Sequence, residues 1–145
     1  MTRSKNASFI FRANSAGLLA VKRRQSSDID KAKHFYDAVL GVLGAGEPVR
    51  NVAGSGHVRL FYRHDGSTFC LTQPINGEPA TAANGGTIGF KCTSAEQVKA
   101  FHDVAVAHGG KSIEDPPGVR VGAAGPMHLA YVRDPDGHAV LIEQR

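Results

Sequence analysis

The sequence predicts an α+β fold built from two copies of one unit, each a strand, a helix and two or three further strands. The first observation is an internal repeat: SDIDKAKHFYDAVLGVLG at 27–44 recurs as TSAEQVKAFHDVAVAHGG at 93–110. The second is a shorter echo after each copy, at 65–72 and 136–143. The third is the alternation of helical and strand patterns within each half. A repeat of this length that occurs twice indicates a duplicated module and not a solenoid.

Each half contains one amphipathic helix. In the first half the apolar residues of one helical face are Ile29, Ala32, Phe35, Tyr36, Val39, Leu40 and Leu43. Asp28 is suited to cap this helix and Gly44 to end it. In the second half Ser94 and Gln97 form a capping-box pattern, and Gly110 follows the last turn. Both helices need a sheet to cover their apolar faces.

Strand patterns supply that sheet. They lie at 57–62, 69–73, 87–91, 127–133 and 138–143, with hairpin turns at 64–67 and 134–137. The segment 74–86 is rich in turn residues and poor in apolar ones, so we interpret it as a linker between the halves. Helices on one face of a sheet leave the other face available to a ligand.

The composition is that of one ordinary globular domain. Of the 145 residues, 41% are hydrophobic and 21% charged, which suffices for a core. No apolar run reaches the roughly 18–20 residues of a membrane span, so we expect no membrane association. The two cysteines, Cys70 and Cys92, are far apart in the sequence and do not suggest a disulfide framework. A reducing cytoplasm is the simplest location.

The net charge of +4 belongs to the amino-terminal segment. Six of the 17 basic residues precede Asp28, the first acidic residue, which leaves 11 basic and 13 acidic residues in the remainder. A slightly acidic body argues against nucleic-acid binding. We therefore treat residues 1–24 as a basic extension. Its composition is also that of a transit peptide, but a disordered extension, a misplaced start or a reading-frame error is favoured.

Two motifs resemble the vicinal oxygen chelate superfamily, which includes glyoxalase I, bleomycin- and fosfomycin-resistance proteins and extradiol dioxygenases. DIDKAKHFY at 28–36 is similar to the family's D-[IL]-x-[RK]-[AS]-x-x-F-Y helix, and VRDPDG at 132–137 to its DPDG turn before the last strand. The resemblance covers about residues 25–145. It implies two βαβββ modules that form a curved, half-open mixed β-sheet with the helices on the convex face.

The resemblance also implies an organisation. Residues 25–145 form a single domain, with module one at about 17–75, the linker at 74–86 and module two at 87–145. Part of residues 1–24 would then supply the first strand. Relatives usually dimerise around a cavity for a small molecule, so a homodimer with a small-molecule ligand is expected.

One stretch fits this pattern poorly. The first strand should fall on VKRRQ at 21–25, where three consecutive cations are unfavourable in a half-buried strand. Either residues 17–21 supply the strand in a shifted register, or this stretch is not the family's native sequence.

In metal-dependent relatives the first and last strands of each module carry the ligands, typically His or Gln and then Glu. Those positions fall here on Val21, Cys70, Thr87 and Leu141. Valine and leucine have no donor atom, and one thiolate cannot hold a catalytic divalent ion. We therefore expect a small-molecule-binding protein without a metal cofactor. The alternative is a metal-dependent lyase, isomerase or dioxygenase of the same superfamily.

No catalytic residue is assigned from the sequence, but six side chains are candidates for substrate binding: Cys70, Thr72, Thr87, Tyr131, Glu143 and Arg120. Tyr131 corresponds to a tyrosine that acts near the substrate in extradiol-type relatives. Glu143 lies two residues beyond Leu141 and hence on the same strand face. Arg120 is expected in a loop, either clamping an anionic substrate or solvated.

Overall fold

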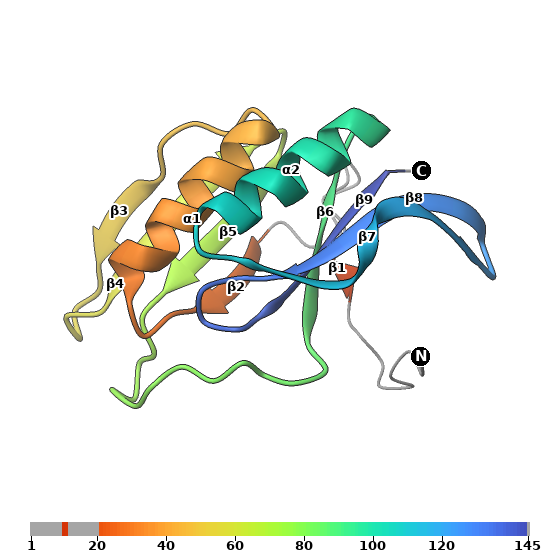
Figure 1. The fold of residues 1–145 in the computed structure, drawn as a ribbon. Helices are drawn as coiled ribbons and strands as arrows, with labels where there is room; N and C mark the ends of the chain where they lie inside the picture. Colours follow the sequence, from red (N-terminus) through yellow and green to blue (C-terminus); the bar gives the residue numbers. More distant parts are fainter. Residues whose placement is uncertain (1–9, 12–20, 145) are drawn as a thin grey trace.

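Two mixed sheets carry two helices on one side (Figure 1). The computed structural model describes residues 10–11 and 21–144, with side chains from Arg24 onward. One sheet has four strands in the order β2-β5-β4-β3, and the other has five in the order β1-β6-β9-β8-β7. Neither sheet closes on itself.

Module one forms the four-stranded sheet and its helix. Its elements are β2 (Val21–Gln25), α1 (Ile29–Val42), β3 (Val49–Val52), β4 (Val58–His64) and β5 (Ser67–Thr72). β2 runs parallel to β5, and β5, β4 and β3 pair in antiparallel fashion.

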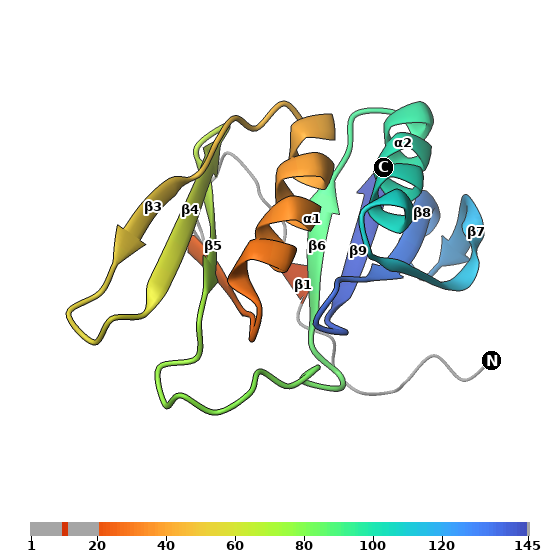
Figure 2. The same cartoon turned by 60° about the vertical axis from the view of Figure 1, so that its left-hand side comes forward.

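Module two repeats this arrangement. Its elements are β6 (Thr87–Lys91), α2 (Ala95–Ala107), β7 (Lys111–Gly122), β8 (Gly125–Arg133) and β9 (Ala139–Gln144). β6 runs parallel to β9, and β9, β8 and β7 pair in antiparallel fashion. The short strand β1 (Ile10–Phe11), which the sequence did not predict, adds to β6. The predicted fold of two βαβββ modules is therefore confirmed, with the two helices side by side (Figure 2).

Within the described residues, the strand that precedes α1 is β2, and it contains the three consecutive cationic residues at 22–24. Arg24 shows how a cation is accommodated there: its side chain is buried and its Nη2 donates to the carbonyl oxygen of Ala139, at 2.8 Å. In the described part of the chain, β2 pairs with β5 and with no other strand. The shifted strand was expected at 17–21, and residues 17–20 lie outside the described residues.

The predicted caps place both helices. The Asp28 side chain accepts from the backbone N–H of Lys31, and Ser94 accepts from that of Gln97, as expected for residues at the N-cap. Gly110 ends α2 where the chain is crowded, because a Cβ there would lie 2.7 Å from the carbonyl oxygen of Ala105.

Aromatic rings join the two modules beneath the helices. Tyr36 packs on Phe69 with ring centroids 4.7 Å apart, Phe69 on Phe90 at 5.6 Å, and Phe90 on Phe101 at 5.8 Å. The four side chains are buried, and they come from α1, β5, β6 and α2 in turn. This core holds both sheets against both helices, so the opposite faces of the sheets keep a fixed orientation.

Buried polar groups also join the modules, at the DPDG turn. The Tyr36 hydroxyl donates to Oδ2 of Asp134 at 2.6 Å. The other oxygen, Oδ1, accepts from the backbone N–H groups of Asp136 and His138, each at 2.9 Å. The tyrosine of the helix motif and the first aspartate of the turn motif are thus direct partners across the module boundary.

A second set of contacts fixes β2 against the same turn. His138 bonds through Nε2 to the carbonyl oxygen of Gln25 at 2.8 Å, and Asp136 accepts from the backbone N–H of Ser27 at 3.1 Å. Both bonds connect module two to the strand and loop that precede α1. In the described residues, no helix is long and apolar enough to cross a membrane.

Candidate functional site on the helix-free face of the sheets

We call the side of the two sheets that is turned away from α1 and α2 the helix-free face. In β9, Val140 and Ile142 belong to the core beneath the helices. Leu141 and Glu143 alternate with them and therefore lie on the helix-free face. Both are nonetheless buried, with exposed fractions of 1% and 2%.

Module two brings several of the predicted residues together on this face. Leu141 pairs with Gly89 on one side and Tyr131 on the other, and Glu143 pairs with Leu129. Paired residues project to the same side of a sheet. Tyr131 is half-buried and Leu129 fully buried, whereas Lys91, the partner of Glu143 on β6, is exposed. Glu143 is therefore paired with an apolar residue on β8 and a cationic residue on β6.

Thr87 lies on the same face, two residues before Gly89 in β6. It pairs with Ala139, which is two residues before Leu141. Thr87 and Leu141 are thus diagonal neighbours on adjacent parallel strands, a separation of roughly 7–8 Å. The two module-two positions that the family resemblance assigned to metal ligands therefore lie close together.

Module one contributes Cys70 and Thr72 on the helix-free face of its own sheet. They alternate in β5 with Phe69 and Leu71, which belong to the core. Cys70 is fully buried and Thr72 half-buried. The Thr72 hydroxyl donates to the carbonyl oxygen of Gln73 at 3.1 Å.

Arg120 is placed differently from the prediction. It lies in β7, which the sequence patterns missed, and not in a loop. Its Nη2 donates to the carbonyl oxygens of Asp115 and Pro116 at 2.8 and 2.9 Å. The guanidinium thus closes a bulge of its own strand, where the register with β8 shifts between Ile113 and Gly118. These contacts hold the guanidinium against the bulge of β7, and a role of Arg120 in substrate binding stays a prediction.

The residues at the ligand positions do not fit a divalent metal. Val21 and Leu141 have no donor atom, Thr87 offers a neutral hydroxyl, and Cys70 is a buried thiol. Catalytic sites need about three protein ligands from imidazole, carboxylate or thiolate groups. Among the described residues, no three side chains of His, Cys, Asp or Glu are grouped to hold an ion. We therefore derive no chemical step through a metal.

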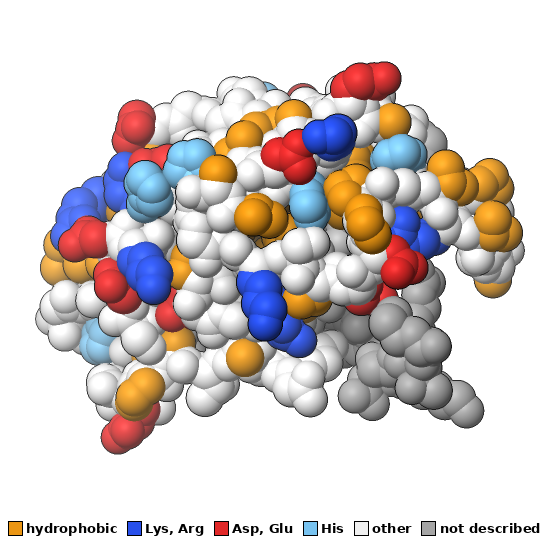
Figure 3. All heavy atoms as spheres, viewed as in Figure 1, with side chains coloured by type: hydrophobic (Ala, Val, Ile, Leu, Met, Phe, Trp, Pro, Cys, Tyr) orange, Lys and Arg blue, Asp and Glu red, His pale blue; other side chains and the backbone are white. Residues whose placement is uncertain are grey.

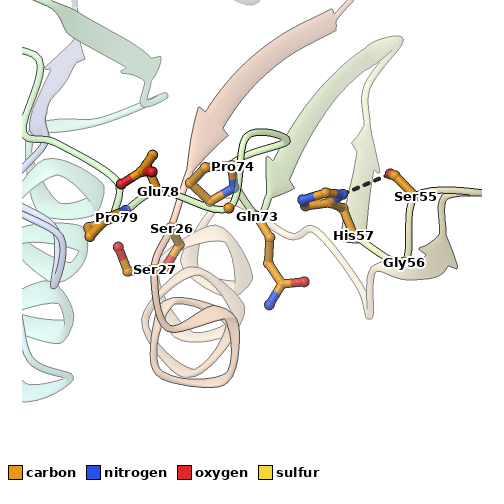
Figure 4. Close-up of a pocket in the computed structure, with 10 residues that line it drawn as sticks. Ser26, Ser27, Ser55, Gly56, His57, Gln73, Pro74, Glu78 and Pro79 are labelled. Carbon is orange, nitrogen blue, oxygen red and sulfur yellow. Dashed lines mark hydrogen bonds between the residues drawn. The ribbon is translucent and has the colours of Figure 1, made fainter.

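A separate hollow lies outside this face, where β5 ends, β4 begins and the linker crosses (Figure 4). It encloses about 450 Å³. His57 Nδ1 bonds to the Ser55 hydroxyl at 2.7 Å, and Gln73 Oε1 accepts from the backbone N–H of Val58 at 2.9 Å. The Ser27 hydroxyl accepts from the backbone N–H of Ala80 at 2.6 Å. This hollow is polar and open, and its side chains mainly hold the linker against the sheet.

With this fold and these motifs, the chain belongs to the Glyoxalase/Bleomycin resistance protein/Dioxygenase superfamily, whose family model matches residues 19–142. The crystal structure of a glyoxalase/bleomycin resistance protein from Albidiferax ferrireducens T118 is 46% identical, with a TM-score of 0.81, and the match covers 88% of this chain and 98% of that one.

Two more distant structures are similar in fold. A glyoxalase-related enzyme from Fulvimarina pelagi is 21% identical, with a TM-score of 0.66, over 89% of this chain and 88% of that one. Lactoylglutathione lyase from Agrobacterium tumefaciens is 18% identical, with a TM-score of 0.60, over 90% of this chain and 96% of that one. No curated protein matches the chain.

Proposed function

We propose that this protein binds a small organic molecule on the helix-free face of its sheets, without a divalent metal. The observation that carries the proposal is the pair Thr87 and Leu141. These diagonal neighbours occupy the positions of a metal-ligand pair in relatives, and together they offer a single neutral oxygen. A face that has lost this donor pair is suited to binding by shape and hydrogen bonds.

The side chains of the face indicate the ligand's chemistry. Leu129 and Leu141 provide buried apolar surface, and the half-buried Tyr131 provides an aromatic ring with a hydroxyl. Glu143 provides a carboxylate beside Leu129, its partner on β8. A molecule with an apolar body and one amine, amide or hydroxyl group matches these features.

We propose that the binding form is a cytoplasmic homodimer. Exposed valines on both outer strands support an association surface: Val49 and Val52 on β3, and Val119 and Val121 on β7, are 56–82% exposed. Figure 3 shows hydrophobic side chains gathered at the end of the molecule where the β7–β8 hairpin projects. Exposed apolar groups of this kind are typical of interfaces between subunits.

A thermal-shift screen with a chemically diverse library tests the binding function. Compounds that stabilise the wild type should lose their effect in Glu143→Gln and keep it in Glu78→Gln, an exposed linker carboxylate. If no compound stabilises the protein, the small-molecule function is wrong. If compounds stabilise both variants equally, the site lies elsewhere. Light scattering checks the dimer, which Val121→Lys should weaken.

A further inference from the structure

A cleft on the opposite side of the molecule is lined by a histidine and an aspartate, and a serine beside the cleft hydrogen-bonds to that histidine. The cleft lies between α2 and the β7–β8 hairpin and encloses about 530 Å³. Its lining includes Lys99, His102 and Asp103 from α2, and His128 from β8. It is separate from the helix-free face, and the inference below does not depend on the proposed binding function.

The three groups are within hydrogen-bonding distance. The Ser112 hydroxyl lies 2.8 Å from Nε2 of His102, and Nδ1 of the same ring lies 3.1 Å from Oδ1 of Asp103. Ser112 pairs with Val132 of β8, whose side chain is in the core beneath the helices. The Ser112 side chain therefore projects from β7 toward α2, where His102 meets it.

The proton positions follow from the carboxylate. Hydrogen bonds from Lys99 and then from His102 lower the pKa of Asp103, so this group is ionised and can only accept. Nδ1 of His102 therefore donates to Asp103, and Nε2 on the other side of the ring can accept from the Ser112 hydroxyl. The Ser112 hydroxyl donates to that nitrogen. With the serine hydroxyl as donor to Nε2, and Nδ1 as donor to the carboxylate, the histidine can take a proton from the serine.

The solvent exposure of the three side chains also favours reaction at the serine. Ser112 is exposed, and the side chain of Asp103 is 52% exposed, whereas that of His102 is 13% exposed. The ring is therefore held between the two groups while the nucleophile stays open to solvent. His128, which lines the cleft, precedes Val132, the partner of Ser112, by four residues and so lies roughly 13 Å from it along β8. That length accommodates the acyl or alcohol part of a small ester.

We propose that Ser112 is a nucleophile activated by His102, with Asp103 as the positioning residue, and that the cleft accepts small activated esters. The Ser112 oxygen attacks the ester carbonyl carbon while its proton passes to Nε2 of His102. The ester C–O bond then breaks, and the leaving group departs as its anion or with the histidine's proton. Where the leaving group departs as its anion, His102 first releases its proton to solvent. His102 then takes a proton from water while the water oxygen attacks the acyl carbon. The bond from that carbon to the Ser112 oxygen breaks, His102 returns the proton to Ser112, and the free acid leaves.

The probe is p-nitrophenyl acetate, whose leaving group needs no proton at neutral pH. Wild type should show a burst of p-nitrophenolate followed by slow turnover, and peptide mass spectrometry should find an acetyl group on Ser112. Ser112→Ala should lower the rate about 10²-fold, the usual contribution of a histidine-assisted step. Ser112→Cys should retain a burst, since a thiol can replace the hydroxyl as nucleophile.

Two further variants separate this role from a structural one. Asp103→Asn should reduce the rate and change the pH profile, because an amide does not hold the ring in the required tautomer. Ser55→Ala is the matched control: Ser55 bonds to His57 through Nδ1, and among the described residues no carboxylate hydrogen-bonds that ring. Its burst should equal that of the wild type.

Three results would overturn the proposal: no acetyl group on Ser112, a rate unchanged by Ser112→Ala, or an equal loss in Ser55→Ala. Thermal denaturation of each variant verifies that it is folded. Since Ser112 and Ser55 are both exposed, neither substitution removes core packing.

Discussion

The hydrogen bond between Tyr36 and Asp134 joins the two sequence motifs that define the modules, and Tyr36→Phe isolates it. The substitution keeps the buried ring and removes only the hydroxyl that lies 2.6 Å from Oδ2 of Asp134. No cavity is created, and the contact with Phe69 is retained. The free energy of unfolding should therefore fall by about the contribution of one buried bond to a charged group.

Hydrogen bonds to charged groups contribute about 1.5–3 kcal/mol, and we expect about 2 kcal/mol here, with a drop in Tm of roughly 4–8 °C. Urea titration followed by circular dichroism measures the difference. Tyr62→Phe is the matched control, because the Tyr62 hydroxyl donates to Asp37, which is partly exposed. That variant should lose under about 1 kcal/mol. Equal losses in the two variants would refute the assignment of a buried bond between modules.

The same tyrosine gives a pH dependence. Burial, and then the Asp134 carboxylate, raise the pKa of Tyr36 well above its ordinary value of 10.0. In the unfolded chain Tyr36 ionises near its ordinary pKa, whereas in the folded chain it stays protonated. The stabilisation is therefore complete below pH 10 and falls as the pH rises above it. Tyr36→Phe should show a shallower alkaline loss of stability than the wild type, measured by urea titrations between pH 8 and about pH 11.

Two further predictions follow from the backbone and from the ligand positions. Gly110→Ala should destabilise by about 1–3 kcal/mol, because its Cβ would meet the carbonyl oxygen of Ala105 at 2.7 Å. Gly41→Ala has nothing within 4 Å and should stabilise by about 0.5–1 kcal/mol; urea titration of both should give opposite signs. The double variant Thr87→His with Leu141→Glu supplies two neighbouring ligands and should bind zinc more tightly than the wild type, measured by calorimetric titration. Equal zinc affinities of the wild type and the folded double variant would contradict the convergence of the two side chains.

The elements that the sequence predicted best are those whose own residues determine them. α1 and α2 combine an apolar stripe with a capping side chain, Asp28 or Ser94, and the structure begins each helix at the next residue. β6 was predicted with its observed bounds, because TIGFK is a short, mostly buried run. Local patterns of this kind need no information from the rest of the chain.

The elements that were missed, or that fitted the expected pattern poorly, depend on partners distant in the sequence. β7 contains Pro116 and Pro117 within a bulge and has no clean alternation, so only pairing with β8 makes it a strand. β2 was expected from the resemblance, but its cations fitted a strand poorly; the buried Arg24 is accommodated there by a hydrogen bond to the carbonyl oxygen of Ala139 in module two. The contact of His102 with Ser112 likewise arises from the packing of α2 on β7. Neither His102 nor Ser112 lies in a sequence motif that predicts this contact.

The sequence was more informative about the helix-free face. The resemblance assigned two ligand positions to Thr87 and Leu141, and strand alternation placed Glu143 on the same face as Leu141; the register of β6 and β9 makes Thr87 and Leu141 diagonal neighbours. The functional groups of these three side chains follow directly from their residue types. Burial of Glu143 to 2% exposure could not be foreseen, because it depends on how the chain packs over the sheet.

The metal content of the purified protein tests the central claim most directly. Protein prepared without chelator should be measured by inductively coupled plasma mass spectrometry. The wild type should contain divalent metal far below one ion per chain. One tightly held ion per chain, lost together with ligand binding on dialysis against a chelator, would contradict metal-free binding and favour a metal-dependent enzyme.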